Sequence, residues 1–181
     1  MMRKASSLSA AAVATKLRAD AQPRKNAGGS AAAQLLDNQL CFALYAASLA
    51  MTGVYKPLLE PLGLTYPQYL AMLVLWEGDG ITVSQLGDRL ALDSGTLTPL
   101  LKRLEAAGLL QRLRDAADER RVLLRLTRPG RALKATASAV PAAVARASGC
   151  GLVEITTLTE RLLTLRLHLL DACPRASPRA A

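Results

Sequence analysis

The sequence predicts a mainly helical domain with one small β-hairpin, because the spacing of apolar residues changes within a short stretch. In residues 93–108 the apolar side chains recur at helical spacing, as Leu97, Leu100, Leu101 and Leu104. After Gly108 the period becomes two, which is typical of strands, over residues 109–114 and again over 122–127. The polar segment DAADER separates these two runs, so we expect them to pair as a hairpin.

The helix before the hairpin has recognisable ends. Asp93 or Thr98 can cap its start by accepting a hydrogen bond from a free backbone N–H, and Gly108 stands where a left-handed C-terminal cap belongs. Pro99 has no backbone N–H, so we expect it near the beginning of the helix. The polar start, residues 94–98, is therefore the end that can be placed in a groove.

A shorter helix is expected directly upstream. Thr82 and Gln85 have the spacing of a capping box, and the apolar residues that follow lie on one side: Val83, Leu86 and Leu90. Two short helices and a hairpin make a winged helix-turn-helix, in which the second helix reads the major groove of DNA and the hairpin is the wing. The predicted fold class is therefore mainly α with a small β-hairpin wing, flanked by N- and C-terminal dimerisation helices. The predicted partner is double-stranded DNA.

The charge distribution agrees with this partner. The formal net charge of the 181 residues is +9, and residues 102–134 hold ten basic against four acidic side chains. Neutralising phosphates releases counterions, which supplies most of the sequence-independent affinity for DNA. A solvated helix face is the alternative explanation of this charge run.

Apolar composition predicts a second copy of the chain as a partner. Hydrophobic residues make up 51% of the sequence and aromatic residues 3%, so we expect an aliphatic core with surplus apolar helix faces, which pack together in a homodimer. No charged residue occurs between Asp37 and Lys56. Four polar residues and a glycine within that stretch favour a helix buried between subunits over a membrane helix: Asn38, Gln39, Ser48, Thr52 and Gly53.

The ends of the chain differ in composition from its middle. Residues rich in Ala, Ser, Lys and Arg begin it, and we interpret them as a disordered arm; a transit peptide and a start assigned too early are the alternatives. The absence of an apolar signal core predicts a cytoplasmic protein. The expected parts are an arm at 1–34, a domain at 35–172 with its DNA-binding part at about 65–128 and dimerisation helices at about 35–61 and 129–171, and a flexible tail at 173–181.

Four motifs in this order resemble one family: LDNQLCFALYAAS, LGLTYPQYLAMLVLWE, LDSGTLTPLLKRLEAAGL and DERRV. They are similar to the MarR-type regulators, and among these to the organic-hydroperoxide-sensing, OhrR-like repressors. The resemblance covers residues 35–171. It implies a repressor rather than an enzyme, which binds a pseudo-palindromic operator as a homodimer, needs no cofactor and is released by organic hydroperoxides.

The resemblance and the chemistry of groove recognition together select the DNA-contacting residues. In the recognition helix we expect contacts from Ser94, Thr96, Thr98, Lys102 and Arg103. In the wing, the family pattern implies that Arg120 enters the minor groove while Asp118 holds its rotamer. Arg112, Arg114 and Arg121 are expected to line the phosphate backbone.

Cys41 is the candidate sensing residue. Tyr45 lies one helical turn on, whereas Tyr55 lies roughly 20 Å farther along a straight helix, so it reaches Cys41 only from the partner of an antiparallel dimer, where Tyr66 can join it. The resemblance likewise implies that these tyrosines hydrogen-bond the thiol. Phenolic donors favour the reactive thiolate, and apolar neighbours favour organic peroxides over hydrogen peroxide. A small buried hydrophobe is the alternative role of such a cysteine.

Cys150 lies between two expected long helices, residues 129–146 and 152–170, with a glycine on either side. The resemblance to two-cysteine members of the branch implies that it resolves the sulfenic acid of Cys41 by forming a disulfide, to the opposite subunit. A junction cysteine without a partner is the alternative. We expect Cys173 to be a bystander, and the cysteine spacing with a single histidine predicts no metal site.

Other functions fit parts of the sequence. A MarR-type repressor could instead be released by a phenolic or aromatic acid, and such a repressor would respond without Cys41. A thiol-dependent organic hydroperoxide peroxidase could use Cys41 and Cys150, but it would need neither a basic wing nor a recognition helix. A winged-helix interaction module would show no salt-sensitive affinity for DNA.

Overall fold

The computed structural model describes residues 34–115, 118 and 120–172 of the chain. The chain divides into two units, Met1–Gly53 and Val54–Ala181, whose boundary falls inside helix α3 (Leu40–Leu59). Residues 1–33 and 173–181 lie outside the described residues, and with them most of the predicted arm, the predicted tail and Cys173.

In the first unit, the described residues form the 3₁₀ turn η1 (Leu36–Asn38) and the first part of α3. None of them is buried, although the segment is predominantly apolar. Leu40, Tyr45 and Leu49 are each more than half exposed. This part of α3 thus has the composition of a buried helix without a covering surface in the single chain.

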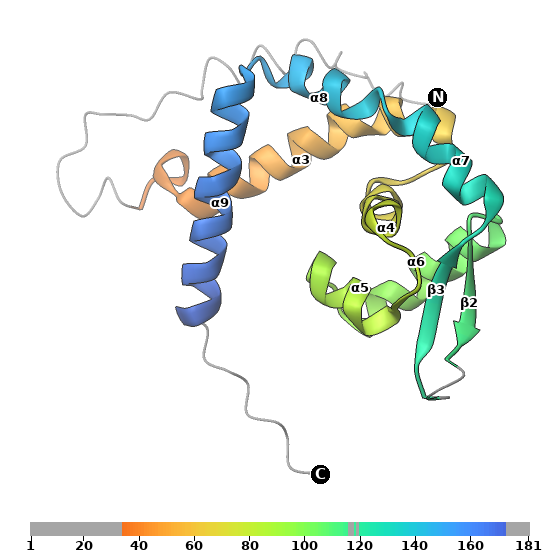
Figure 1. Cartoon of the computed structure of the whole chain (residues 1–181). Coiled ribbons are helices and arrows are strands. Elements are labelled where there is room, and N and C mark those ends of the chain that lie inside the picture. Colours follow the sequence, from red (N-terminus) through yellow and green to blue (C-terminus); the bar gives the residue numbers. More distant parts are fainter. Residues whose placement is uncertain (1–33, 116–117, 119, 173–181) are drawn as a thin grey trace, which may run out of the picture. The chain divides into compact units, whose positions relative to one another are not determined.

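The second unit has the layout of a winged helix-turn-helix (Figure 1). After the end of α3 its elements are η2 (Glu60–Leu62), α4 (Tyr66–Glu77), β1 (Ile81–Thr82), α5 (Val83–Leu90), α6 (Ser94–Ala106), β2 (Leu110–Arg114), β3 (Val122–Leu126), α7 (Arg128–Ala137), α8 (Val140–Ser148) and α9 (Leu152–Ala172). The predicted fold class, mainly α with a small hairpin wing, is confirmed.

The wing is an antiparallel hairpin with the predicted strands. β2 and β3 pair from Leu110 opposite Leu126 to Arg114 opposite Val122. The structure adds the two-residue strand β1, which no apolar run announces and which pairs with β3 on the other side. The sheet order is therefore β1-β3-β2, with β3 in the centre.

In the second unit α4 packs against α5, α6 and the wing (Figure 1). The core gathers around this helix, whose residues are apolar on almost every side, as is typical of a central helix. Its Ala71, Met72 and Leu75 are at most 1% exposed. Around them pack Leu86 of α5, the four leucines of α6, and Leu110, Leu124 and Leu126 of the wing. Burying a leucine stabilises the fold by about 1.5–3 kcal/mol, so this cluster fixes the wing base and the helix-turn-helix on one support.

The single helix predicted over residues 129–146 is wrong. α7 ends at Ala137 and α8 begins at Val140, with Ser138 and Ala139 between them. Pro141 is the cause, because it has no N–H to donate to the carbonyl four residues earlier, Ala137, and instead occupies the first turn of α8. The sequence contained this signal.

The long helix α9 extends over Leu152–Ala172, close to the predicted range, and none of its residues is buried. Leu152, Leu163 and Leu167 are each more than half exposed. No helix among the described residues is long and apolar enough to cross a bilayer.

Candidate DNA interface and thiol site

Helix α5 begins at the predicted capping box. The Thr82 hydroxyl accepts a hydrogen bond from the Gln85 N–H at 3.1 Å, and the Gln85 side chain accepts one from the Thr82 N–H at 2.8 Å. The turn into α6 requires close approach at Gly87, where an added Cβ would lie 2.9 Å from the carbonyl oxygen of Leu92. The absence of a side chain at Gly87 thus lets the chain turn closely against α5.

Helix α6 is capped by Asp93 and not by Thr98. One Asp93 carboxylate oxygen accepts from the Thr96 N–H at 2.8 Å, and the other accepts from the Thr96 hydroxyl at 3.0 Å. These bonds, the backbone one first, hold the pKa of Asp93 below its usual value. The Thr98 hydroxyl donates to the carbonyl of Ser94 at 2.8 Å. Pro99 is the sixth residue of α6, somewhat deeper in the helix than expected.

The two faces of α6 are as predicted. Leu97, Leu100, Leu101 and Leu104 are buried, at no more than 7% exposure. The candidate DNA-contacting residues of this helix are all exposed: Ser94, Thr96, Thr98, Lys102 and Arg103. The helix start and one basic side are therefore available to a ligand.

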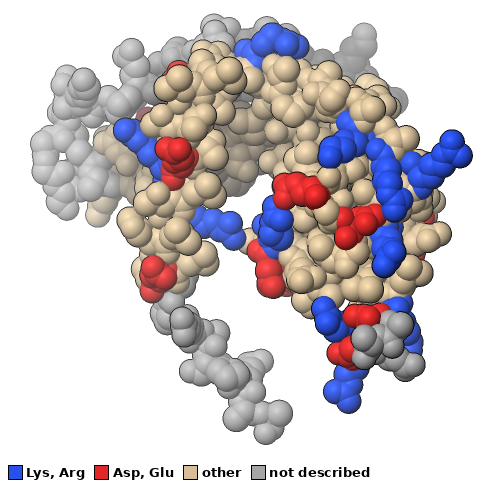
Figure 2. Space-filling model, viewed as in Figure 1, with Lys and Arg blue, Asp and Glu red and all other residues tan. Residues whose placement is uncertain are grey.

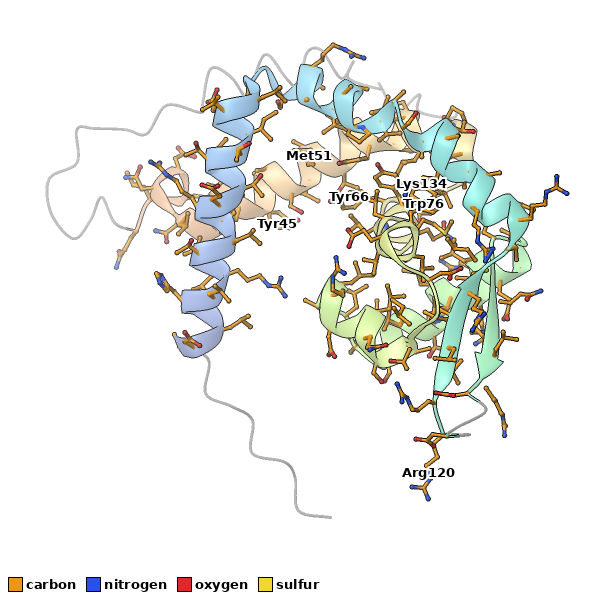
Figure 3. All side chains as sticks on the ribbon, viewed as in Figure 1. Tyr45, Met51, Tyr66, Trp76, Arg120 and Lys134 are labelled. Atoms are coloured by element: carbon orange, nitrogen blue, oxygen red, sulfur yellow. The ribbon has the colours of Figure 1, made fainter. Side chains whose placement is uncertain are left out.

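The turn of the wing is shaped by Asp118. Its carboxylate accepts a hydrogen bond from the backbone N–H of Arg120 at 3.0 Å, and its carbonyl accepts from the Arg121 N–H at 2.9 Å. These main-chain bonds form an Asx-type turn, and the role of Asp118 in holding the Arg120 rotamer stays a prediction. Arg120 itself extends outward at the tip of the wing (Figure 3). The Arg121 guanidinium lies 3.8 Å from the carboxylate of Asp115.

Arg112, expected on the phosphate backbone, is engaged inside the protein. The Glu105 carboxylate of α6 accepts from the Arg112 N–H at 3.1 Å and from its Nε at 2.8 Å, and lies 2.6 Å from its Nη2. Hydrogen bonds from Arg112 hold the pKa of Glu105 below its usual value. Arg112 therefore already has an acidic partner in the single chain, and both side chains are only about one-third exposed.

The other side of the wing base is held by Asp79, in the loop before β1. Its Oδ2 accepts from the Leu126 N–H of β3 and from Arg131 of α7, both at 3.1 Å. The Arg131 guanidinium also donates to the Leu126 carbonyl at 2.8 Å. Asp79 and Arg131 together fix the end of the hairpin to α7.

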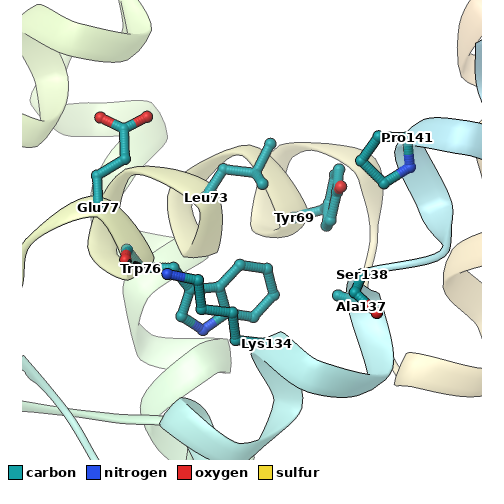
Figure 4. A pocket seen from close by; sticks show the side chains of 8 residues that line it. All are labelled: Tyr69, Leu73, Trp76, Glu77, Lys134, Ala137, Ser138 and Pro141. Atoms are coloured by element: carbon teal, nitrogen blue, oxygen red, sulfur yellow. Dashed lines mark hydrogen bonds between the residues drawn. The ribbon is translucent and has the colours of Figure 1, made fainter.

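A further link joins α4 to α7 around a small apolar pocket (Figure 4). The Trp76 indole N–H donates to the Gly130 carbonyl at 2.9 Å, and the Lys134 ammonium donates to the Trp76 carbonyl at 2.8 Å. The pocket has a volume of about 270 Å³ and is lined by Tyr69, Leu73, Trp76, Glu77, Lys134, Ala137, Ser138 and Pro141.

Basic side chains gather at the wing tip and over β3 and α7 (Figure 2). At the tip these are Arg114, Arg120 and Arg121, all exposed. Further exposed basic side chains lie on β3 and α7: Arg125, Arg128, Arg131 and Lys134. The positive charge thus covers the wing, which is expected to meet phosphates, and continues onto α7.

Cys41 belongs to the first unit and is a free, exposed thiol. It has no hydrogen-bond partner among the residues that the structure describes. Tyr45, one turn away on α3, is 62% exposed. The single chain therefore presents both side chains on an open helix surface.

Tyr55 and Tyr66 belong to one aromatic cluster in the second unit. Their ring centroids are 4.7 Å apart, and the ring of Tyr69, which sequence reasoning missed, lies 5.7 Å from Tyr55. Burial, followed by the neighbouring phenols, raises the pKa of Tyr55 above its ordinary value of 10.0. Tyr55 is therefore a protonated hydrogen-bond donor at neutral pH.

Cys150 lies at the predicted junction, between α8 and α9. Its thiol is free and half-buried, and it approaches the carbonyl of Ser148 at 3.6 Å. The preceding Gly149 has φ 68°, a left-handed turn that glycine adopts without strain. Within the described part of the chain, no group of three or more His, Cys, Asp or Glu residues could hold a metal ion.

Comparison with known proteins shows the family to which this chain belongs. A family model described as transcriptional regulator SarA/Rot matches residues 53–136. The organic hydroperoxide resistance transcriptional regulator of Bacillus subtilis is 51% identical over 130 residues, which cover 72% of this chain and 88% of the relative. This chain belongs to the MarR/SarA family of transcriptional regulators.

Two further proteins extend the family comparison. The HTH-type transcriptional regulator TtmR of Methylorubrum extorquens is 52% identical over 136 residues, covering 75% of this chain and 70% of the relative. AbfR of Staphylococcus epidermidis has been solved in its reduced form bound to DNA; it is 37% identical, with a TM-score of 0.62, over 75% of this chain and 96% of that one. Its disulfide-formed structure, also 37% identical, gives a TM-score of 0.54 over 75% and 92% of the two chains.

The family model covers the two candidate sites of this MarR/SarA-family regulator unequally. The family model extends from the middle of α3 to the end of α7, so it includes the helix-turn-helix and the wing but neither Cys41 nor Cys150. The chain is thus a DNA-binding transcriptional regulator of winged-helix type. The assignments to individual residues rest on chemistry and position.

Sequence reasoning missed the residues that hold the wing of this regulator: Asp79, Glu105, Arg131, Trp76 and Lys134. Asp79 beside two glycines resembles ordinary loop composition, and its partners lie 47 and 52 residues away. Glu105 and Arg112 are seven residues apart across Gly108, a separation that neither a helix nor a tight hairpin makes adjacent. Only the folded chain reveals these contacts.

Proposed function

We propose that this regulator is a repressor that senses organic hydroperoxides through Cys41 and leaves its operator when that thiol is oxidised. The observation that carries the proposal is the 51% identity to the Bacillus subtilis organic hydroperoxide resistance regulator, together with an exposed free thiol at Cys41. A solved relative is named in both a reduced, DNA-bound form and a disulfide form, which supports a thiol-based mechanism.

The chemistry needs two steps. The Cys41 thiolate attacks one peroxide oxygen, so the S–O bond forms while the O–O bond breaks, and the departing alkoxide takes up a proton to give an alcohol. The thiolate of Cys150 then attacks the sulfenic sulfur, so the S–S bond forms while the S–O bond breaks, and the departing hydroxide takes up a proton to give water. The glycines beside Cys150 give its junction the freedom such an approach requires. The exposed apolar neighbours of Cys41 favour alkyl hydroperoxides over hydrogen peroxide.

A homodimer completes the thiol site in this proposal. The apolar faces of α3 and α9 lack cover in one chain, and a second copy is the partner that closes both at once. The Cys41 thiolate then accepts hydrogen bonds from Tyr45 of its own helix and from Tyr55 and Tyr66 of the partner subunit. Residues 35–61 and 129–171 act as dimerisation helices, and 65–128 as the DNA-binding part.

DNA recognition follows from the second unit. The polar start of α6 enters the major groove, where Ser94, Thr96 and Thr98 contact base edges or phosphates and Lys102 and Arg103 supply charge. Arg120 reaches the minor groove from a turn that Asp118 holds in shape, and Arg121 adds backbone charge. The two DNA-binding parts of a dimer fit a pseudo-palindromic duplex at one spacing only. Repacking of the dimerisation helices changes that spacing and releases the duplex.

The test uses a duplex recovered by in vitro selection with the reduced full-length protein. Fluorescence anisotropy should show release after one equivalent of cumene hydroperoxide, and a Cys41→Ser variant should stay bound. Non-reducing intact mass spectrometry should find an inter-subunit disulfide in the wild type, and a sulfenic acid or a mixed disulfide in Cys150→Ser. Release of Cys41→Ser by the peroxide would refute the proposal.

A second candidate trigger is favoured by the pocket between α4 and α7. Its apolar walls and the ammonium of Lys134 suit a phenolic or aromatic acid, with the anionic group near Lys134 and the ring against Trp76 (Figure 4). Salicylate would then release Cys41→Ser and wild type from the selected duplex equally. Response to salicylate but not to peroxide selects this trigger.

A further inference from the structure

The recognition helix and the wing are joined by one side chain, that of Glu105. It lies in the last turn of α6 and contacts the middle of β2 through Arg112. Among the described residues β2 is an outer strand, because the sheet order is β1-β3-β2. An outer strand exposes backbone groups that the sheet itself does not satisfy.

The ladder shows which of these groups point outward. The Asp115 N–H donates to the Arg121 carbonyl at 2.9 Å, which marks a hydrogen-bonded pair at the tip of the hairpin. Hydrogen-bonded and non-hydrogen-bonded pairs alternate in an antiparallel ladder, so Arg112, three pairs farther along opposite Leu124, is in a non-hydrogen-bonded pair. Its N–H therefore points away from β3, and the Glu105 carboxylate accepts it at 3.1 Å.

The same carboxylate also binds the Arg112 guanidinium, at 2.8 Å from Nε and 2.6 Å from Nη2. Main chain and side chain of one wing residue are thus fixed to one helix residue, which leaves the hairpin little freedom to rotate about the joint at Gly108. Charge-assisted bonds of this geometry are the strong class of hydrogen bond.

We propose that Glu105 is a positioning residue for DNA recognition, which sets the angle between recognition helix and wing through Arg112. A carboxylate on a DNA-binding head repels phosphates, so its electrostatic effect alone would weaken binding. The joint has the opposite effect, because a helix and a wing held at one angle reach the major and minor grooves together. Arg112 is accordingly part of this joint and makes no phosphate contact. The proposal does not involve oxidation.

The joint is tested first by amide hydrogen exchange on the full-length, reduced protein. The Arg112 N–H should be protected in the wild type and should exchange at least about tenfold faster in E105A, while the Leu124 amide in the centre of the sheet stays protected. Unchanged exchange at Arg112 would contradict the geometry. A loss of protection at both positions would mean that Glu105 merely holds the fold together.

DNA binding supplies the second test, because electrostatics and positioning predict opposite signs. The probes are a duplex selected with the wild-type protein and a scrambled duplex of equal length. E105A should bind the selected duplex about tenfold more weakly, within the usual coupling range of contacting residues, and the scrambled duplex equally or more tightly. Equal or tighter binding of the selected duplex by E105A would overturn the proposal. E77A is the matched control, since it removes an equally short 2.6 Å ion pair, to Arg89, away from the wing.

Arg112 is tested by salt dependence. A phosphate contact contributes a slope of about 0.9 to the plot of log affinity against log salt. R112A should lose affinity for the selected duplex with no change in that slope, and E105A/R112A should bind no more weakly than the weaker single variant. A slope reduced by about 0.9 in R112A would make Arg112 a phosphate contact and refute its part in the joint.

If E105A fails to fold, the variant E105Q replaces it, because glutamine keeps one acceptor without the charge. E105Q should still show reduced preference for the selected duplex over the scrambled one. Unchanged preference refutes the proposal.

Discussion

Asp79 and Arg131 form an ion pair of 3.1 Å, and both side chains also hydrogen-bond the backbone of Leu126, the last residue of β3. Asp79 accepts the Leu126 N–H and Arg131 donates to the Leu126 carbonyl. Because β1 is only two residues long, it pairs with Leu123 and Leu124 and does not extend as far as Leu126. The Asp79 side chain supplies the acceptor that a longer β1 would have provided. A carboxylate thus accepts an otherwise unpaired backbone N–H on each side of the wing, Asp79 from β3 and Glu105 from β2.

Removing the Asp79 carboxylate should destabilise the protein mainly through the backbone N–H that it leaves without an acceptor. We expect Asp79→Ala to lower the free energy of unfolding by about 1–3 kcal/mol, and Asp79→Asn, which keeps an acceptor, to recover most of this. The ion pair itself contributes less, because the Arg131 side chain is 58% exposed and solvent screens its charge. Urea denaturation followed by circular dichroism measures both; an equal loss in the two variants would assign the effect to the charge.

Gly130 is a position where any side chain should disrupt the joint between wing and α7. A Cβ there would lie 1.9 Å from the Leu109 carbonyl oxygen, a distance that only separation of backbone segments relieves. We expect Gly130→Ala to destabilise the fold by about 3 kcal/mol, at the upper end for overpacking. Gly78→Ala is the control, because a Cβ there meets nothing within 4 Å and its φ of −170° suits any residue. Similar unfolding midpoints for both variants would contradict this.

Asp93 should make the stability of the recognition helix depend on acid pH. Its pKa is lowered in the folded protein, chiefly by the Thr96 N–H, so its stabilisation is fully present above the unfolded pKa of about 3.8 and is lost as pH falls through the lower folded value. Asp93→Asn keeps a cap but does not titrate. The stability difference between wild type and this variant, from urea midpoints, should be constant from pH 7 to pH 5 and shrink below pH 4. A constant difference at pH 3 would contradict the assignment.

Tyr55 should control how fast Cys41 reacts, if its phenol donates to the thiolate across the dimer. Burial raises its pKa, so the donor stays protonated under all physiological conditions, and its own stabilising effect is lost only as pH rises through that raised value. Tyr55→Phe should slow oxidation of Cys41 by cumene hydroperoxide about tenfold, the loss of one charge-assisted bond. Quenched samples analysed by intact mass spectrometry give the rate. Tyr69→Phe is the matched control from the same ring cluster, and equal rates in all three proteins would remove Tyr55 from the mechanism.

Local signals explain where prediction from sequence succeeded. The capping pair Thr82 and Gln85, the cap at Asp93 and the left-handed Gly108 act over a few residues, so their identities suffice to place helix ends. The change from helical to alternating spacing located the hairpin for the same reason. The break between α7 and α8 was also local, and reading Pro141 as a helix start would have found it.

The sequence by itself determined the winged helix-turn-helix, its buried leucines and its exposed basic residues, because these depend on periodicity and capping between near neighbours. Only the tertiary structure decided which charged residues are free to meet a ligand. Arg112 and Arg120 look alike in the sequence, yet one is held by Glu105 and the other extends from the wing tip. The reason is physical: an ion pair depends on the distance between two charges, and for residues joined by the packing of a helix on a sheet that distance is set by the whole core.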